Sequence, residues 1–334
     1  MPIKAPNGKV YNSLLHYVPH GINSKVFVPV PENEPRYIAR KNEIFGGNKY
    51  DFIVMYNSRN IARKRTSNIL LAYKAFCDSL PKEKSAKCLL FLHTEVRHEA
   101  GTDLPAVKEA FCPEYDVAFS PGKFAPEDMA VLYSVADCLV NISSNEGFGL
   151  SVAEALMCGT PVIVNMTGGL QDQAGNVDDD GKPVEFSLNF GSNNVGKYKK
   201  CGVWAYPVWP ATRMVQGSIP TPYIFDDICK WEDVADGMMY WYLMTRAQRK
   251  ACGLKGREWC CGAGGLNAEN MCNQFITAME YTMDNFVPVK RFDAFTSDDH
   301  VGHQMPHGSL GFEMHKPVVD DIKVKVEETL AKLL

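Results

Sequence analysis

The chain has 334 residues, of which 46% are hydrophobic and 22% are charged, and its formal net charge is -4. This composition is that of an ordinary globular protein and excludes wholesale disorder. The charge balance leaves no overall basic field that would hold nucleic acid or an anionic membrane. No apolar run approaches the roughly 18 residues needed to cross a bilayer, and the N-terminal residues lack the apolar segment of a signal peptide. We therefore expect a soluble, cytoplasmic protein with no membrane span and no nucleic-acid partner.

The chain contains 11 cysteines, an odd number, and they are scattered without any CxxC pair. Several lie in apolar stretches, as Cys77, Cys88 and Cys138 do. Neither a disulfide framework nor a zinc knuckle has this spacing. We expect reduced thiols, mostly in the core.

From about residue 50, short apolar runs alternate with helical patterns. The predicted strands span residues 51–57, 88–93, 117–119, 138–142 and 161–164. The predicted helices span residues 66–79, 125–136, 149–158, 231–245, 246–259 and 267–285. Continuous apolar strands between amphipathic helices indicate an α/β, Rossmann-like fold with a parallel sheet covered on both faces. Ligands of such sheets bind at the carboxyl ends of the strands.

Two segments depart from this alternation. Residues 171–225 are rich in Asn, Asp, Gly, Pro and Trp, which predicts a long insertion. Trp204, Trp209, Arg213 and the turn at 221–223 form either part of an ordered structural loop or a lid over the site. The end of the chain, 317–334, has apolar residues at both near-heptad and alternating positions, so it could form a helix or a strand. Whether it packs on its own domain or docks to another chain also stays open.

The stretch from Glu146 to Glu154 carries the clearest chemical pattern. Two carboxylates stand seven residues apart across a predicted strand-to-helix turn that contains Gly147 and Gly149. The free N–H groups at the start of the helix suit an anion. Glu154 lies roughly 7–8 Å further along the helix, about the reach from a diphosphate to its ribose. The arrangement suits a nucleoside diphosphate, with Glu146 facing whatever extends beyond the phosphates.

This stretch resembles the glutamate–seven–glutamate motif of retaining GT-B glycosyltransferases, most closely family GT4, the glycosyl transferases group 1. Arg59 and Lys64 have the arginine–four–lysine spacing with which these enzymes hold the donor diphosphate. Further matching stretches lie at 17–29, 133–137 and 155–169, so that the resemblance spans about residues 14–290, mainly the C-terminal, donor-binding domain.

The resemblance implies an enzyme that transfers a sugar from a nucleotide diphosphate sugar, with retention of configuration and with no metal or other cofactor. The implied catalytic residues are Glu146, Arg59 and Lys64. The implied donor-binding residues are Glu154, Gly147, Phe148, Gly149, Leu150, Ser120, Gly168 and Gly169. The Gly168–Gly169 turn is expected to present backbone N–H groups to the sugar or the diphosphate. The acceptor, whether glycan, lipid or protein, is not identified, nor are the base and the sugar.

The resemblance also predicts the domain organisation. Residues 1–30 correspond to a linker or remnant of the acceptor-side domain, 31–265 to the nucleotide-sugar-binding domain, 266–290 to a crossing helix, and 291–334 to a tail. A complete N-terminal acceptor domain is not recognised. We therefore expect a partner chain or a homodimer, and the alternative function is a non-catalytic nucleotide-sugar-binding subunit that needs a separate acceptor domain.

Two other motifs have metal-like patterns, and an unrelated Rossmann protein is a further alternative. The run Asp178–Asp180 is expected to form a turn rather than a metal site. His300, His303 and His307 have metal-like spacing but lie in a Gly- and Ser-rich tail. No GxGxxG follows the first strand, which disfavours a dehydrogenase.

Overall fold

The computed structural model describes residues 2–4, 10–12, 16–184 and 191–286. The chain divides into two compact units, Met1–Asp284 and Asn285–Leu334. The fold described below is that of the first unit. Within it, β1 (Pro2–Lys4) and β2 (Val10–Asn12) pair antiparallel with each other.

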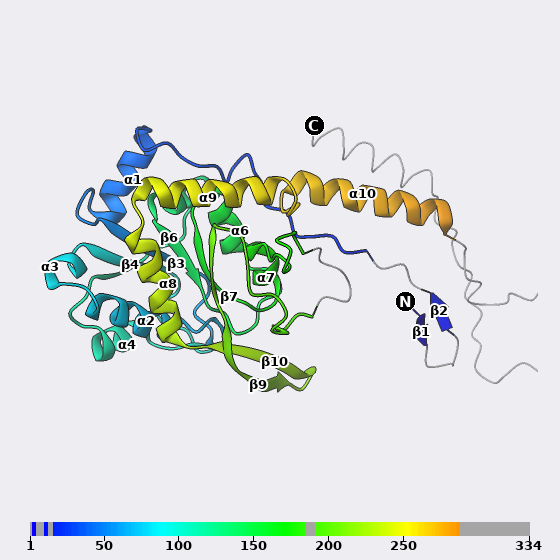
Figure 1. The fold of residues 1–334 in the computed structure, drawn as a ribbon, viewed down its shortest axis with the longest axis horizontal. Coiled ribbons are helices and arrows are strands. Elements are labelled where there is room, and N and C mark those ends of the chain that lie inside the picture. The colour runs from blue at the N-terminus through cyan, green and yellow to red at the C-terminus, as the bar shows by residue number, and fades with distance from the viewer. Residues whose placement is uncertain (1, 5–9, 13–15, 185–190, 287–334) are drawn as a thin grey trace, which may run out of the picture. The chain divides into compact units, whose positions relative to one another are not determined.

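A six-stranded parallel sheet forms the centre of the first unit, in the order β5-β4-β3-β6-β7-β8 (Figure 1). Its strands are β3 (Phe52–Asn57), β4 (Cys88–His93), β5 (Val117–Phe119), β6 (Cys138–Asn141), β7 (Val162–Asn165) and β8 (Ala205–Val208). The order reverses between β3 and β6, which are neighbours although two strands separate them in the sequence. Such a switch point leaves a crevice at the carboxyl ends of its two strands, where ligands of these sheets bind.

Helices cover both faces of the sheet and complete two apolar cores. On one face lie α1 (Pro35–Phe45), α5 (Pro126–Val135), α6 (Leu150–Met157), α7 (Gly169–Ala174) and α9 (Arg246–Cys261). On the other lie α2 (Thr66–Asp78), α4 (Leu104–Phe111) and α8 (Trp231–Leu243), with the short α3 (Lys82–Ser85) following α2. The predicted Rossmann-like α/β fold is confirmed, and the predicted strands and helices up to residue 165 form within one or two residues of their expected bounds.

Besides the short α3 and α7, two longer helices, α1 and α4, were not predicted from the sequence. Both begin with a proline in the first turn, which is a start signal. The side chain of Asp103 caps α4 by accepting from the N–H of Ala106 at 3.1 Å. The signals were present, but α4 is only eight residues long, so its apolar periodicity was weak.

The segment 171–225 is not one long loop, and that prediction is wrong for its second half. It contributes β8, the sixth strand of the main sheet, and most of an antiparallel ribbon of β9 (Pro210–Ser218) and β10 (Thr221–Cys229). Pro207 lies inside β8 and hid the strand from the sequence pattern. A proline is tolerated there because β8 is an edge strand.

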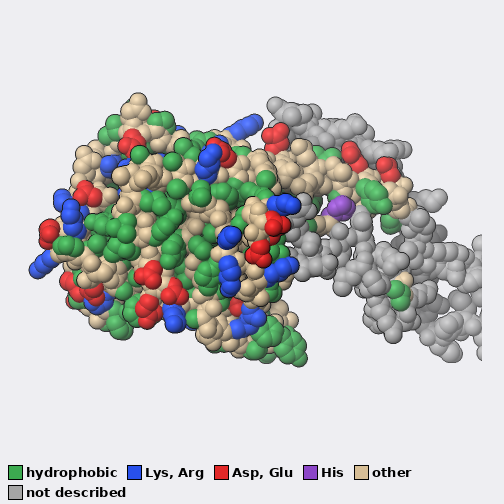
Figure 2. Space-filling model, in the orientation of Figure 1, with side chains coloured by type: hydrophobic (Ala, Val, Ile, Leu, Met, Phe, Trp, Pro, Cys, Tyr) green, Lys and Arg blue, Asp and Glu red, His purple; other side chains and the backbone are tan. Residues whose placement is uncertain are grey.

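The aromatic residues of this segment differ in their surroundings. Trp204 stacks on Trp259 with ring centroids 5.6 Å apart and donates its indole N–H to the carbonyl of Gln173. Trp209 packs against the core, so both tryptophans are structural rather than parts of a lid. Hydrophobic side chains gather instead at the tip of the β9–β10 ribbon, where Ile219 is fully exposed and Tyr223 is 81% exposed (Figure 2).

The last described helix is α10 (Ala268–Asn285), close to the crossing helix predicted at 267–285. None of its residues is buried, and Phe275, Ile276 and Met279 are each more than half exposed. A partner chain or homodimer remains a prediction. Among the described helices, none combines the length and the apolar character needed to cross a bilayer.

Candidate functional site

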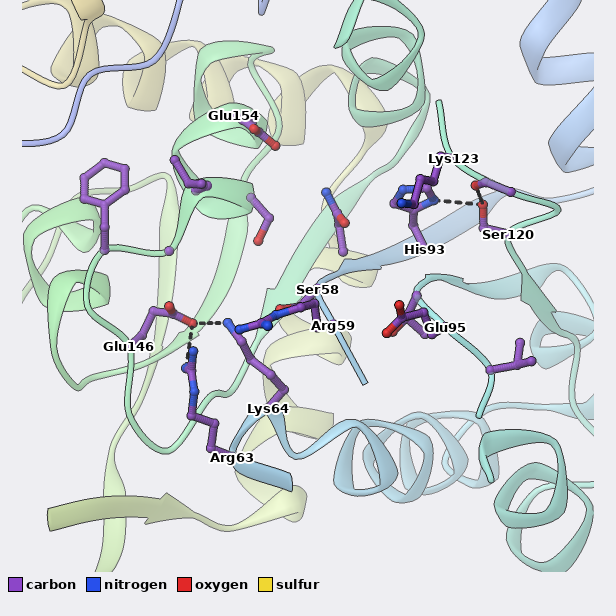
Figure 3. A pocket seen from close by; sticks show the side chains of 18 of the residues that line it. Ser58, Arg59, Arg63, Lys64, His93, Glu95, Ser120, Lys123, Glu146 and Glu154 are labelled. Atoms are coloured by element: carbon purple, nitrogen blue, oxygen red, sulfur yellow. Dashed lines mark hydrogen bonds and ion pairs between the residues drawn. The ribbon is translucent and has the colours of Figure 1, made fainter. Parts of the chain in front are cut away.

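A cavity of about 790 Å³ opens at the switch point, at the carboxyl ends of β3, β4 and β5 and beside the start of α6 (Figure 3). It brings together residues from five separate stretches of the chain. Eight of the predicted site residues line it: Arg59, Lys64, Ser120, Glu146, Phe148, Gly149, Leu150 and Glu154. The location agrees with the rule for parallel sheets.

Lys64 and Glu146 meet as an ion pair at one end of this cavity (Figure 3). Lys64 ends a short 3-10 helix, η1 (Ala62–Lys64), and is buried, whereas Glu146 follows β6. Nζ of Lys64 donates to Oε2 of Glu146, and Nη1 of Arg63 lies 3.4 Å from the same oxygen. Burial lowers the pKa of Lys64, while the pairing with Glu146 opposes that shift. The pair ties the loop after β6 to the loop after β3.

Arg63 reinforces this junction through the backbone. Its Nη1 donates to the carbonyl of Asn145 at 2.5 Å, and its own carbonyl accepts from the N–H of Ser144 at 2.9 Å. Arg59 lies nearby, exposed at the cavity. Two cationic side chains thus contact the carboxylate of Glu146, and a third, Arg59, lines the same cavity, so positive charges outnumber the single negative one.

Glu154 is held by a chain of two hydrogen bonds. The Nδ2 amide of Asn57 donates to the hydroxyl of Tyr133, and that hydroxyl donates to Oε2 of Glu154, each at 2.6 Å. Burial raises the pKa of Glu154, and the hydrogen bond from Tyr133 opposes the shift. Burial also raises the pKa of Tyr133, so its hydroxyl stays protonated and able to donate. Tyr133 thus orients the carboxylate of Glu154, which lines the cavity.

The start of α6 supplies the remaining polar groups. Gly149, its N-cap, adopts a φ of 96°, a left-handed conformation that favours glycine. This turn aims the helix start at the cavity, and the N–H groups of the first turn have no carbonyl within the helix to bind. Leu150 and Ser151 carry two of those groups and both line the cavity. A helix start of this kind attracts anions.

Three predicted residues, Gly147, Gly168 and Gly169, line a different cavity of about 250 Å³ that shares Glu146 with the first. The N–H of Gly169 donates to the carbonyl of Glu146 at 3.0 Å, and the N–H of Gly168 donates to that of Ser192 at 2.6 Å. The expectation that these amides are free for a ligand is therefore wrong in this structure. The amide of Gly169 holds the Glu146 loop, and the amide of Gly168 binds the segment that contains Ser192. Contact of any of the three glycines with a donor stays a prediction.

Sequence reasoning missed several residues that line the larger cavity: His20, Asn57, Ser58, His93, Thr94, Glu95, Val96, Gly122 and Lys123. His93 is the last residue of β4, and its Nδ1 lies 2.8 Å from Oγ of Ser120. Ser120 in turn donates to the carbonyl of Gly122, so Nδ1 of His93 is the donor in their contact. Burial lowers the pKa of His93 and favours its neutral form. The rule that ligands lie beyond strand carboxyl ends, applied to every strand, names Asn57 and His93.

Of the two metal-like motifs, the run Asp178–Asp180 lies within the described residues and the three histidines of the tail do not. Asp178 accepts from the N–H of Lys182 at 2.8 Å, within the expected turn. Across the described ranges, no cluster of three or more His, Cys, Asp or Glu side chains is arranged to hold a metal. His300, His303, His307 and the terminal segment 317–334 lie outside the described residues.

A family model described as "Glycosyl transferases group 1" matches residues 114–181, a range that contains both Glu146 and Glu154. Over this range the chain is similar to the group 1 glycosyltransferases. Mannosylfructose-phosphate synthase from Agrobacterium fabrum is 30% identical over 160 residues, which are 47% of this chain and 33% of that enzyme. The resemblance drawn from the motifs is thereby confirmed.

Solved structures agree on the fold. Sucrose-phosphate synthase from Thermosynechococcus elongatus superposes with a TM-score of 0.53 at 20% identity, over 80% of this chain and 52% of that one. Anabaena HepE, solved with UDP and glucose, gives a TM-score of 0.51 at 14% identity, over 78% of this chain and 55% of that one. Both support the GT-B type of Rossmann-like fold. The chain spans about half the length of these two structures.

Proposed function

We propose that this chain binds a nucleotide diphosphate sugar and transfers the sugar to an acceptor with retention of configuration and without a metal. One observation carries the proposal: a single cavity joins Arg59 and Lys64, the start of α6, and the oriented carboxylate of Glu154. These are the groups that a diphosphate and its ribose require. The motif resemblance to group 1 glycosyltransferases, which implies the same positions, supports the proposal.

The donor would extend along the cavity in an order that its chemistry dictates. The base would lie toward Ser120 and His93, and Glu154 would accept hydrogen bonds from the ribose. Because the start of α6 and the cations attract anions, the diphosphate would lie between them. The transferred sugar would then reach Glu146 and Phe148 at the far end.

The reaction would break the bond between the anomeric carbon and the diphosphate oxygen, which keeps the electron pair. The acceptor hydroxyl would bond to the same face of that carbon and give its proton to the departing phosphate. Arg59, Lys64 and the first-turn N–H groups would stabilise the charge that develops on the diphosphate. Fixed cations at that position would take the part that a metal ion plays in other transferases.

Calorimetry with UDP, GDP and ADP, each with and without magnesium, tests the donor site. We expect micromolar, magnesium-independent binding of one nucleotide to the wild type, and its loss in Glu154→Ala. The matched control is Glu280→Ala, an exposed glutamate of α10. A wild type that binds none of the three, or a Glu154→Ala variant that binds as tightly, would contradict the proposal. The anomeric form of the sugar released by slow donor hydrolysis, read by NMR, tests retention.

The second candidate function is a nucleotide-sugar-binding subunit whose acceptor domain is a separate chain. The exposed apolar side chains of α10 favour it, because they form a surface that a partner could cover. Binding of the donor without hydrolysis or transfer, and turnover only after a partner is added, would support this function over the first.

A further inference from the structure

Residues 17–22, here called the strap, are fastened at both ends to the body of the first unit. At one end, the hydroxyl of Tyr17 donates to Oδ2 of Asp172 at 2.7 Å. At the other, Ile22 donates to the carbonyl of Leu266 at 2.8 Å and accepts from the N–H of Ala268 at 2.9 Å. The strap is therefore placed by residues more than 150 positions away in the sequence.

Gly21 brings the strap into close contact with the start of α10. A Cβ at this position would lie 2.5 Å from Cα of Ala268, so only glycine fits. The N–H of Gly21 also lies 3.2 Å from the sulfur of Met271. These contacts fix the backbone on the C-terminal side of His20.

His20 projects from the strap to the larger cavity, which it lines. Its ring stacks on Phe148, with centroids 5.0 Å apart and planes inclined by 23°. Its Nδ1 lies 3.2 Å from the carbonyl oxygen of Gly21. Because a carbonyl only accepts, Nδ1 carries the proton, which leaves Nε2 of the neutral ring as an acceptor.

Figure 3 shows Glu146 at the opposite end of the cavity from His93 and Ser120, and Phe148, two residues after Glu146 in the chain, lines the same cavity. A nucleoside diphosphate laid along the cavity as proposed above would leave its sugar at the Glu146 end. We infer that His20 is a specificity-determining residue for the transferred sugar, accepting a hydrogen bond from a sugar hydroxyl through Nε2 while Phe148 supports the ring. The inference rests on the proposed function and goes beyond it, because it assigns part of the sugar-binding surface to the strap.

Comparing a diphosphate with its own sugar conjugate separates the two ends of the cavity. UDP and UDP-glucose, GDP and GDP-mannose, and ADP and ADP-glucose are titrated into the full chain by calorimetry. In His20→Ala we expect the affinity for the diphosphate to stay within about twofold, and that for its sugar conjugate to fall by about threefold to tenfold, as for one lost hydrogen bond. His16→Ala, an exposed histidine outside the strap, is the matched control and should leave both affinities unchanged.

His20→Phe distinguishes recognition from packing. It keeps a ring to stack on Phe148 but has no acceptor, so we expect it to lose the same preference for the sugar conjugate. Restoration of that preference by phenylalanine would overturn the inference, since a purely structural stack would explain it. An equal loss of both ligands in His20→Ala, or no loss of either, would overturn it as well and leave the proposed donor site intact.

If the proposed function is wrong, the experiment gives a different outcome. A wild type that binds neither the diphosphates nor their sugar conjugates overturns the donor site and this inference together. Circular dichroism of each variant confirms that the fold is retained, so that a loss of binding is not a loss of folding.

Discussion

Tyr133, on α5, donates its hydroxyl hydrogen to the carboxylate of Glu154, on α6, at 2.6 Å, and both side chains are largely withdrawn from water. Asn57, at the end of β3, donates to the same hydroxyl. Three elements of the fold thus meet at the hydroxyl of Tyr133, which links Asn57 to Glu154. The position of the candidate ribose ligand depends on a tyrosine that does not line the cavity.

Tyr133→Phe should weaken nucleotide binding by about threefold to tenfold, because Glu154 loses the donor that orients it. It should also lower the free energy of unfolding by about 1 kcal/mol, since the half-buried amide of Asn57 loses its acceptor. Calorimetry and urea denaturation measure the two effects. Tyr240→Phe, a partly exposed tyrosine of α8, is the control. Unchanged affinity would show that Glu154 needs no support from Tyr133.

Lys64→Ala should weaken binding of the preferred nucleoside diphosphate by about tenfold to hundredfold, because a buried cation beside the phosphates is removed. Lys74→Ala, which breaks a surface ion pair with Asp78 on α2, should leave the affinity unchanged. Lys64→Ala combined with Glu146→Ala should weaken binding less than the two separate losses predict, because the residues act as a pair. Calorimetry on the four variants provides the comparison, and strict additivity would contradict the coupling.

Asp172→Asn should stabilise the protein increasingly as the pH rises from about 4 to about 6. Burial raises the pKa of Asp172 from 3.8 to about 6, although the hydrogen bond from Tyr17 opposes the shift. Between these values the folded chain binds the proton that the unfolded chain has lost, so the wild type loses stability as the pH rises. Asparagine removes this dependence and still accepts from Tyr17.

The expected gain of Asp172→Asn at pH 7 is at most about 3 kcal/mol, and it should nearly vanish near pH 4. Urea denaturation of both proteins at pH 4, 5, 6 and 7 gives the difference curve. A difference that stays constant with pH would show that Asp172 titrates normally in the folded chain.

Asp137→Ala should destabilise the fold by about 3–5 kcal/mol without touching the cavity. Asp137 is buried, accepts from the N–H of Ile53 at 2.8 Å and pairs with Arg246 and Arg249, each at 2.8 Å. Its removal leaves two partly or wholly buried cations without their shared carboxylate. Asp128→Ala, which breaks the half-exposed pair with Arg40, should cost less than about 1 kcal/mol by the same urea measurement. Similar losses in the two variants would contradict this ranking.

Much of the sheet was predictable because its strands are continuous apolar runs. Residues 52–57 and 88–93 form strands that are buried along most of their length, which is the pattern of a parallel sheet. The edge strand β8 was missed because an exposed edge tolerates Pro207, and proline normally argues against a strand. Local pattern therefore predicted the central strands better than the edge.

Part of the candidate site was likewise visible in the sequence, and part of it appears only in the structure. The spacing from Glu146 to Glu154, the glycines between them and the pair Arg59 and Lys64 were visible in the sequence, because a short motif specifies its own turn and helix start. The convergence of Gly149, the two glutamates and the two cations in one cavity followed from the rule that parallel strands share a carboxyl edge. The ion pair of Lys64 with Glu146, more than 80 residues apart in the chain, did not follow from any motif.

The sequence by itself determined the family resemblance, the alternation of strands and helices, and the identity of the paired acids and cations, because these depend on local periodicity and spacing. Only the tertiary structure decided that Tyr133 orients Glu154 and that His20 stacks on Phe148. It also decided that the N–H groups of Gly168 and Gly169 donate to carbonyls of other segments. Each of these contacts joins residues more than 20 positions apart. Packing and the pairing of buried polar groups select such contacts, and no local pattern encodes them.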